Sequence, residues 1–319
     1  MIKNSRFPLF FLLILAMPSA ISHDGSPTPK PIDKASMLKQ LGWTYHIPIK
    51  TRKLRNGLYM LEGFGGNVAA SIGSDGTVIV DNQASELIPR ILDQITNLGG
   101  EKIDFVINTH WHWDHADGNI ALGKTESVII SHTNSRDMMK SDNLINLVYM
   151  SYIQPAYPIN ALPQITFDDE MMLHFNNEDI RLMHFGAAHT TGDAAILFQE
   201  SNVIHLGDLY MKGFYPFIDA RNGGSIDGVI YFLTKVIEEI NQDTLVIPGH
   251  GPISNYDELV DYVLMLKKVR DRITRMIKAG SSLEDVLLAD ITAEWDDGLG
   301  DNKQFINRAF MSLTHRIVE

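Results

Sequence analysis

The chain has 319 residues, enough for one large or two small domains, and its 45% hydrophobic and 21% charged residues are ordinary for a globular enzyme with a sizeable core. Its formal net charge of −12 argues against nucleic acid as the main partner, because binding the phosphate backbone requires a basic surface. The chain has no cysteine, which excludes disulfides and thiolate metal ligands.

Residues 1–22 have the pattern of an export signal peptide. Lys3 and Arg6 supply the positive end, Pro8 to Met17 the apolar run, and the small residues from Pro18 to Ser22 the cleavage options. The apolar run is too short for a comfortable membrane span, although an uncleaved anchor is the alternative. We therefore expect a periplasmic or secreted protein with no stable membrane insertion after cleavage.

Residues 23–42 are expected to form an amino-terminal linker with a helical turn near Lys34 to Leu41, and residues 43–319 to form the main domain. Alternating apolar residues predict strands over 58–61, 67–72 and 77–81, with a hairpin turn at Ser74-Asp75-Gly76. A helix over 85–98 follows and ends at Gly99-Gly100.

An alternation of strands and helices continues the chain. Strands are predicted over 103–108 and 128–131, and helices over 119–122 and from about Thr133. The segment 144–157 is rich in Leu, Met and Tyr but has no clear period. It is either plain core or an apolar flap over a cleft.

The second half of the chain shows a similar succession of predicted strands and helices. Its predicted strands cover 165–167, 180–184, 194–199, 203–206 and 244–247. Its predicted helices are one over 225–240 and two carboxy-terminal helices, from Asp257 and Ser282. Two β-rich halves, each closed by helices, indicate one α/β (α+β) domain with four layers.

The most informative stretch is His110-Trp111-His112-Trp113-Asp114-His115, directly after an apolar strand. Strand residues i and i+2 project to the same side, so His110 and His112 can converge on one ion. Asp114 and His115, one turn further on, would face a neighbouring ion. The alternative is a histidine-rich surface loop, but random placement of 12 histidines rarely puts three within six residues.

Three further polar clusters follow predicted strands. They are His189-Thr190-Thr191-Gly192-Asp193, Gly207-Asp208 and Pro248-Gly249-His250-Gly251-Pro252. Each contains a glycine, which permits a tight turn that aims a side chain into a cleft. Singly each cluster is weak, because a lone histidine after a strand is more often a structural residue.

Taken together and in this order, the motifs resemble the metallo-β-lactamase superfamily over about Asn56 to Pro252. The resemblance implies a four-layer αββα sandwich of two mixed β-sheets flanked by helices. It implies one metal bound by His110, His112 and His189. It implies a second metal bound by Asp114, His115 and His250, with Asp208 bridging both. Asp81 matches the family's early buried acid, so Asp81 is expected to support the metal loop, and Asp193 to orient a ligand.

The resemblance favours two Zn²⁺ per chain, because imidazoles and carboxylates suit zinc, with iron or manganese as alternatives. Two ions about 3.5–4 Å apart share a hydroxide that attacks an acyl carbonyl in an ester, lactone, thioester or amide. Asp114 would orient that hydroxide and pass its proton to the leaving atom. Members that hold redox iron usually have Glu where His112 stands, so a hydrolase is favoured.

One departure from the pattern of the zinc β-lactamases indicates which branch of the superfamily this chain resembles. Zinc β-lactamases usually have Cys or Ser where Asp208 stands, so this chain is closer to the glyoxalase II and lactonase-like branches. The carboxy-terminal helices lack an evident basic cluster for glutathione, which counts against glyoxalase II itself. The alternatives are a zinc β-lactamase, a phosphodiesterase for small substrates, and a non-catalytic metal-binding partner of an exported relay system. A small-molecule substrate is expected, with no nucleic acid.

The run Tyr210 to Phe217 follows the bridging acid and is expected to line the substrate pocket. The candidate pocket residues in this run are Tyr210, Lys212 and Phe214. Trp113 of the histidine loop is a further candidate. Trp113 could instead pack beneath that loop, and Lys212 could bind a carboxylate or simply be solvated. No metal is assigned to His132, His184 or His205.

Overall fold

The structure is a computed structural model that describes residues 29–314. The predicted signal peptide, residues 1–22, and the first part of the predicted linker lie outside the described residues. Within residues 29–314, no helix combines the length and the apolar character needed to cross a membrane.

The first sheet has seven strands in the order β1-β2-β3-β4-β5-β6-β9. Its strands β1 to β4 pair antiparallel, whereas β4, β5, β6 and β9 pair parallel, so the sheet is mixed. The strands are β1 (Lys50–Lys53), β2 (Leu58–Glu62), β3 (Val68–Gly73), β4 (Gly76–Val80), β5 (Phe105–Ile107), β6 (Val128–His132) and β9 (Ile165–Phe167).

The second sheet has six strands in the order β10-β11-β12-β13-β14-β15. All neighbours pair antiparallel except β13 and β14, which run parallel. The strands are β10 (Glu170–Phe175), β11 (Glu178–Met183), β12 (Ala195–Phe198), β13 (Val203–His205), β14 (Leu245–Ile247) and β15 (Ser254–Asn255).

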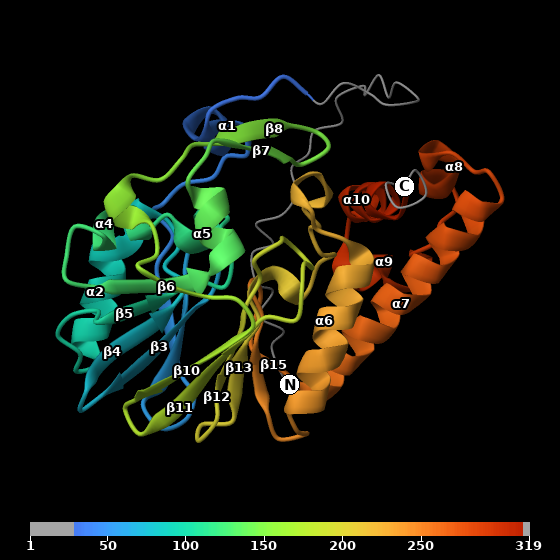
Figure 1. Ribbon diagram of the computed structural model, residues 1–319. Helices are drawn as coiled ribbons and strands as arrows, with labels where there is room; N and C mark the ends of the chain where they lie inside the picture. The colour runs from blue at the N-terminus through green and yellow to red at the C-terminus, as the bar shows by residue number, and fades with distance from the viewer. Residues whose placement is uncertain (1–28, 315–319) are drawn as a thin grey trace, which may run out of the picture.

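The two sheets face each other, and helices cover both outer faces (Figure 1). Successive strand residues point to opposite faces, and β4 shows the result: Val78 and Val80 pack between the sheets, whereas Ile79 packs under the helices of the first half. In the second sheet, Ile196 faces the other sheet and Leu197 faces the second set of helices. Three apolar layers thus separate four structural layers, and the predicted αββα sandwich is confirmed.

Helices α2 (Ile88–Asn97), α3 (Trp113–Ala116), α4 (Asn119–Leu122) and α5 (Thr133–Met139) belong to the first half, which is drawn in cyan to green in Figure 1. Helix α6 (Ile226–Glu239) covers the second sheet together with the carboxy-terminal helices. Side-chain caps fix where α6 and α7 begin, since Ser225 accepts from Gly228 N and Asn255 accepts from Glu258 N.

The carboxy-terminal part holds more helices than the two predicted. Helices α7 (Tyr256–Lys278) and α8 (Leu283–Leu288) begin within a residue of the predicted starts. Two further helices follow, α9 (Ala293–Leu299) and α10 (Lys303–Thr314). Helix α9 has a weak sequence pattern because it is short and contains Gly298, a poor helix former.

Two segments whose sequence patterns were ambiguous also form secondary structure that packs on the first core. Residues 144–157 contain most of a β-hairpin of β7 (Asn143–Asn146) and β8 (Ser151–Gln154), which buries Ile145 and Tyr152 in the first core. In the segment predicted as a linker, α1 (Lys34–Gln40) buries Met37 and Leu38 in the same core. Residues 29–42 are therefore packed on the domain.

Candidate metal centre

The polar clusters gather where strands end. Parallel strands end at the same edge of a sheet, and the histidine loop follows β5, Asp208 follows β13 and His250 follows β14. The turn that carries His189 lies between β11 and β12, and Ala194 N at its end donates to Thr109 O at 2.8 Å, which ties this turn to the histidine loop. Tertiary folding therefore brings four distant segments to one place.

The first group consists of His110, His112 and His189, all buried, with candidate ligand atoms within 4.8 Å of one another. His112 Nε2 lies 3.0 Å from the Asp219 carboxylate, and His189 Nδ1 lies 2.8 Å from Phe217 O. Both of these oxygens can only accept, so the two ring nitrogens facing them carry the protons of the neutral rings. The lone pairs of His112 Nδ1 and His189 Nε2 then face each other at 3.0 Å.

His110 completes this group through a hydrogen-bond relay. Thr109 Oγ1 donates to Asp81 at 2.8 Å, so the same hydroxyl accepts from His110 Nδ1 at 3.0 Å. His110 Nε2 is left buried without a hydrogen-bond partner. Three imidazole lone pairs therefore converge in a buried space, an arrangement that is repulsive unless a cation lies between them.

The second group consists of Asp114, His115 and His250. His115 Nδ1 donates to Asp81 Oδ2 at 2.6 Å, so its other nitrogen, Nε2, faces the site, 3.1 Å from His250 Nε2. Asp114 Oδ2 lies 3.2 Å from the same His250 nitrogen. This group again turns two imidazole nitrogens and a carboxylate oxygen toward one point.

Asp208 lies between the two groups. Its Oδ1 is 3.1 Å from His115 Nε2 and its Oδ2 is 3.8 Å from His189 Nε2, so one oxygen faces each group. Oδ1 is buried and makes no hydrogen bond. A carboxylate in this position fits the bridging role that the resemblance implies.

In this centre, burial and the neighbouring charges shift the pKa values of His115 and Asp208 in opposite directions. Burial alone would lower the pKa of His115, but the carboxylates of Asp208, Asp81 and Asp114 outweigh it and hold that pKa well above its usual range. Burial would likewise raise the pKa of Asp208, but His115 and His250 hold it well below its usual range. The surroundings of His115 and Asp208 therefore favour positive charge, and the nitrogen and oxygen donors of the centre are those of a divalent metal site.

Comparison with known proteins agrees with this geometry. Residues 63–258 match the family model of the metallo-β-lactamase superfamily. The chain belongs to the metallo-β-lactamase superfamily. Members of this superfamily are mostly hydrolases, and the His and Asp cluster makes this chain a member suited to binding divalent metal.

Two curated relatives are similar over 60% of the chain. An uncharacterized protein of Aquifex aeolicus is 27% identical over 192 residues, 84% of its own length. A probable metallo-hydrolase of Methanocaldococcus jannaschii is 24% identical over 198 residues, 91% of its length.

Solved structures share the fold at low identity. A metallo-β-lactamase from Pontibacter korlensis aligns with a TM-score of 0.57 and 14% identity, covering 69% of this chain and 99% of that one. The metallo-β-lactamase FIM-1 from Pseudomonas aeruginosa, in its mono-zinc form, aligns with a TM-score of 0.55 and 17% identity, covering 70% of this chain and 96% of that one.

The centre of this superfamily member opens on one side. The side chains of Asp114 and His250 are 23% and 21% exposed, whereas those of His115 and Asp208 are 0% and 6% exposed. The half-buried ring of Phe214 lies 6.3 Å from the His250 ring at this opening. A substrate would therefore approach along Asp114, His250 and Phe214.

Three other pocket candidates have different surroundings. Trp113 is buried in the first core with Lys34 Nζ over its ring, and Tyr210 is buried with its hydroxyl 2.8 Å from Ser254 Oγ. Both are core residues, because each side chain is buried in an apolar cluster. Lys212 Nζ donates to Glu258 at 2.5 Å and to Ile253 O at 3.0 Å, so its charge is already paired.

The predicted supporting acids both make buried contacts. Asp81 follows β4 in the left-handed conformation (φ 60°), which short polar side chains tolerate, and its carboxylate accepts from Thr109 and His115. Asp193 accepts from Thr190 N at 2.8 Å and Thr190 Oγ1 at 2.7 Å. It holds the turn after His189 and does not contact the imidazole itself.

Sequence reasoning missed Asp219, the buried partner of His112. Asp219 also accepts from Asn222 Nδ2 at 2.8 Å. It lies at the end of the aromatic stretch after Asp208, with no strand before it and no second histidine or acid beside it. No local pattern marked it, because its role depends on a contact 107 positions away in sequence.

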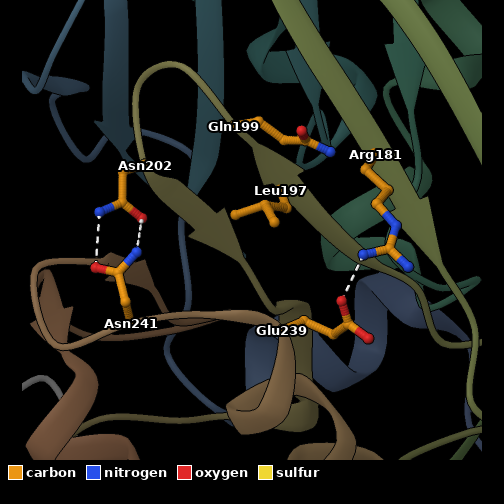
Figure 2. A pocket seen from close by; sticks show the side chains of 6 residues that line it. All are labelled: Arg181, Leu197, Gln199, Asn202, Glu239 and Asn241. Atoms are coloured by element: carbon orange, nitrogen blue, oxygen red, sulfur yellow. Dashed lines mark hydrogen bonds and ion pairs between the residues drawn. The ribbon is translucent and has the colours of Figure 1, made fainter.

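A separate hollow of about 260 Å³ lies on the second sheet beside the end of α6 (Figure 2). Four of its polar side chains are already paired: Arg181 pairs with Glu239 (and with Glu170), and Asn202 and Asn241 bond each other. It contains none of the candidate metal ligands.

Proposed function

We propose that this chain is an exported hydrolase that would hold two zinc ions and that cleaves an ester, lactone, thioester or amide bond in a small molecule, by attack of an activated water on the acyl carbonyl. The observation that carries this proposal is the pair of converging donor groups. His110, His112 and His189 form one, Asp114, His115 and His250 form the other, and the Asp208 carboxylate faces both.

The donor set supports zinc, because neutral imidazoles and carboxylates are its usual ligands and the chain has no thiol. Iron and manganese accept similar donors, and FIM-1 in its mono-zinc form shows that a protein of this fold can be obtained with one ion. Metal identity and number are therefore part of the test.

When bound, the two ions supply Lewis acidity and lower the pKa of a water to about 7, which provides the nucleophile. Asp114 is the acid best placed to orient that nucleophile and to carry a proton to the leaving atom, since its carboxylate is buried enough to be fixed and exposed enough to reach substrate. Phe214 and Phe217 provide apolar contacts beside the reacting bond, at 6.3 Å from His250 and 6.0 Å from His112.

Asp208 supports an acyl hydrolase over a zinc β-lactamase. The solved β-lactamases that align with this chain are below 25% identical to it, so they support the fold and not the substrate. The proposed periplasmic or secreted location rests on the sequence pattern of residues 1–22.

The test uses purified, zinc-loaded protein, whose metal content is measured by elemental analysis. Turnover is measured in parallel on lactone, thioester, ester, β-lactam and phosphodiester substrates. We expect two zinc ions per chain and turnover of an acyl substrate, both reduced in His112→Ala. His174→Ala is the matched control, because His174 is exposed on β10, far from the centre.

Each other outcome identifies a competing function. Metal uptake without turnover of any substrate would favour the non-catalytic metal-binding partner. Fast turnover of a β-lactam would overturn the argument from Asp208. Turnover limited to phosphodiesters would replace acyl transfer by phosphoryl transfer on the same metal pair.

A further inference from the structure

Arg308 is a buried cation for which the proposed reaction has no role. It lies on α10 and is 7% exposed. Its Nε and Nη2 donate to a single uncharged acceptor, Asn307 Oδ1, at 3.1 and 2.5 Å. Within residues 29–314, no carboxylate forms an ion pair with its guanidinium.

An unpaired guanidinium is costly to bury. Arginine stays protonated under all ordinary conditions, so it cannot escape the cost by losing its charge. Burial lowers the pKa of Arg308, and nearby Asp219 only partly compensates. The hydrogen bonds of the guanidinium involve Nε and Nη2, so among the described residues Nη1 has no acceptor. The Nη1 edge therefore retains donor capacity for a ligand.

The position of Arg308 on α10 shows what it faces. Residues four apart share one face of a helix, so Gln304, Arg308 and Ser312 form a stripe. Gln304 Nε2 donates to Leu147 O in the β7–β8 hairpin at 3.0 Å, and Ser312 Oγ accepts from Ile226 N at the start of α6 at 3.3 Å. Arg308 lies between these two anchor points.

The element opposite this stripe is η4 (Ala220–Asn222), which packs against α10. It directly follows Asp219, the acid that holds His112. Asn222 Nδ2 ties η4 to the hairpin through Leu144 O at 3.1 Å. Arg308 therefore lies where α10, η4 and the β7–β8 hairpin meet, on the His112 side of the metal centre; Figure 1 shows α10 in red close to the tip of this hairpin.

A second arginine is close by. Arg221, on η4, is exposed, and the charges of Arg221 and Arg308 affect each other. Neither Arg308 nor Arg221 forms an ion pair with a carboxylate among residues 29–314, so two positive charges lie near each other in a chain of net charge −12. Like charges held together in this way favour an anion between them.

We propose that Arg308, assisted by Arg221, binds a carboxylate group of the substrate, so that the natural substrate is an acyl compound carrying a second, free carboxylate. Arg308 would be a binding residue that fixes the far end of the substrate while the metal centre acts on its acyl end. This inference rests on the proposed function. Arg308 lies outside residues 63–258, the part matched by the family model.

Two p-nitrophenyl esters of equal acyl length test the proposal: the monoester of glutaric acid, which keeps a free carboxylate, and the pentanoate, which has none. We expect the zinc-loaded wild type to prefer the glutarate ester. In Arg308→Gln, the KM for the glutarate ester should rise about 10-fold to 100-fold, the range expected for a lost charge-assisted hydrogen bond, with kcat changed less than about 3-fold. Values for the pentanoate should stay unchanged.

The control is Lys303→Gln, which removes an equal charge from an exposed position of the same helix and should alter neither ester. Arg308→Lys keeps the charge but loses the planar fork, so its KM for the glutarate ester should be intermediate. If Arg308→Gln does not fold, the KM of Arg308→Lys and the preference of the wild type for the glutarate ester still test the proposal. A purely structural role for Arg308 predicts equal losses on both esters, and that result would overturn the proposal.

Binding without turnover separates this proposal from the proposed function. Glutarate is titrated calorimetrically into zinc-loaded wild type and Arg308→Gln, with inorganic phosphate as a parallel probe. If glutarate binds through Arg308 and no acyl substrate is cleaved, the proposed function fails and the carboxylate site stands. If esters are cleaved but the glutarate affinity is the same in both proteins, or only phosphate depends on Arg308, the carboxylate site fails.

Discussion

The carboxylate of Asp219 is the contact that holds His112 in place, and its removal is the sharpest test of the centre. Asp219 is 1% exposed and accepts from His112 Nε2 at 3.0 Å. This contact fixes the proton on Nε2 and leaves Nδ1 to bind metal. Asp219→Asn keeps the shape and one acceptor but loses the charge, whereas Asp219→Ala also leaves the His112 N–H without its acceptor.

The expected loss of zinc affinity follows from this difference between the two variants. Loss of a partner that orients a metal-binding histidine costs about 10-fold to 100-fold in metal affinity, or about 1.4–2.7 kcal/mol. We expect Asp219→Asn near the lower value and Asp219→Ala near the upper one. The loss should fall on the ion held by His110, His112 and His189, because the other group does not touch Asp219.

The assay is zinc competition with a chromophoric chelator, which resolves two binding steps. Asp169→Asn is the control, since it removes an exposed carboxylate and changes the net charge equally. Unchanged affinity in both Asp219 variants, or an equal weakening of both steps in Asp219→Ala, would refute the assignment of His112 Nδ1 as a ligand atom oriented by Asp219.

Three further changes test other parts of the centre. Asp208→Ala should weaken both zinc-binding steps, because the Asp208 oxygens face both groups; loss of only one step in the same competition assay would contradict a bridge. In Gly66→Ala the new Cβ would lie 2.2 Å from His115 Cε1, so the second step should weaken, whereas Gly298→Ala, with nothing within 4 Å, should not affect metal binding. Lys212→Ala should leave the KM for the glutarate ester unchanged and lower the stability to chemical denaturation by about 0–1 kcal/mol, because its charge is paired with half-exposed Glu258; a selective KM increase would restore Lys212 as a substrate contact.

The parts of the fold that could be predicted are those with a strong local pattern. Strands β4 and β5 are short apolar runs followed directly by polar residues, and β13 leads to Gly207-Asp208, so both the strand and the site at its end were visible. Strand β1 (Lys50–Lys53) was missed because all its residues are exposed and none is apolar. It exists because Lys50 to Lys53 pair with β2, a contact that no local pattern encodes.

The candidate ligands could likewise be predicted from the sequence, whereas some of the residues that support them could not. His110, His115 and His250 follow apolar strands, and the chemistry of their side chains marks them in the sequence. Phe217 supports His189 through its main-chain carbonyl oxygen, which any residue could supply. The side chain of Phe217 therefore carries no signal of that role.

Asp81 shows how far a resemblance can extend such reasoning. Its carboxylate acts on both groups through one oxygen: Oδ2 accepts from His115 Nδ1 and also from Thr109 Oγ1, whose hydroxyl sets the proton on His110. The family pattern pointed to Asp81 but not to this double action, which depends on Thr109 standing between the two. One buried acid thus fixes a ligand of each proposed ion, so substituting Asp81 should disturb both zinc-binding steps, whereas the effect of Asp219 should stay on one.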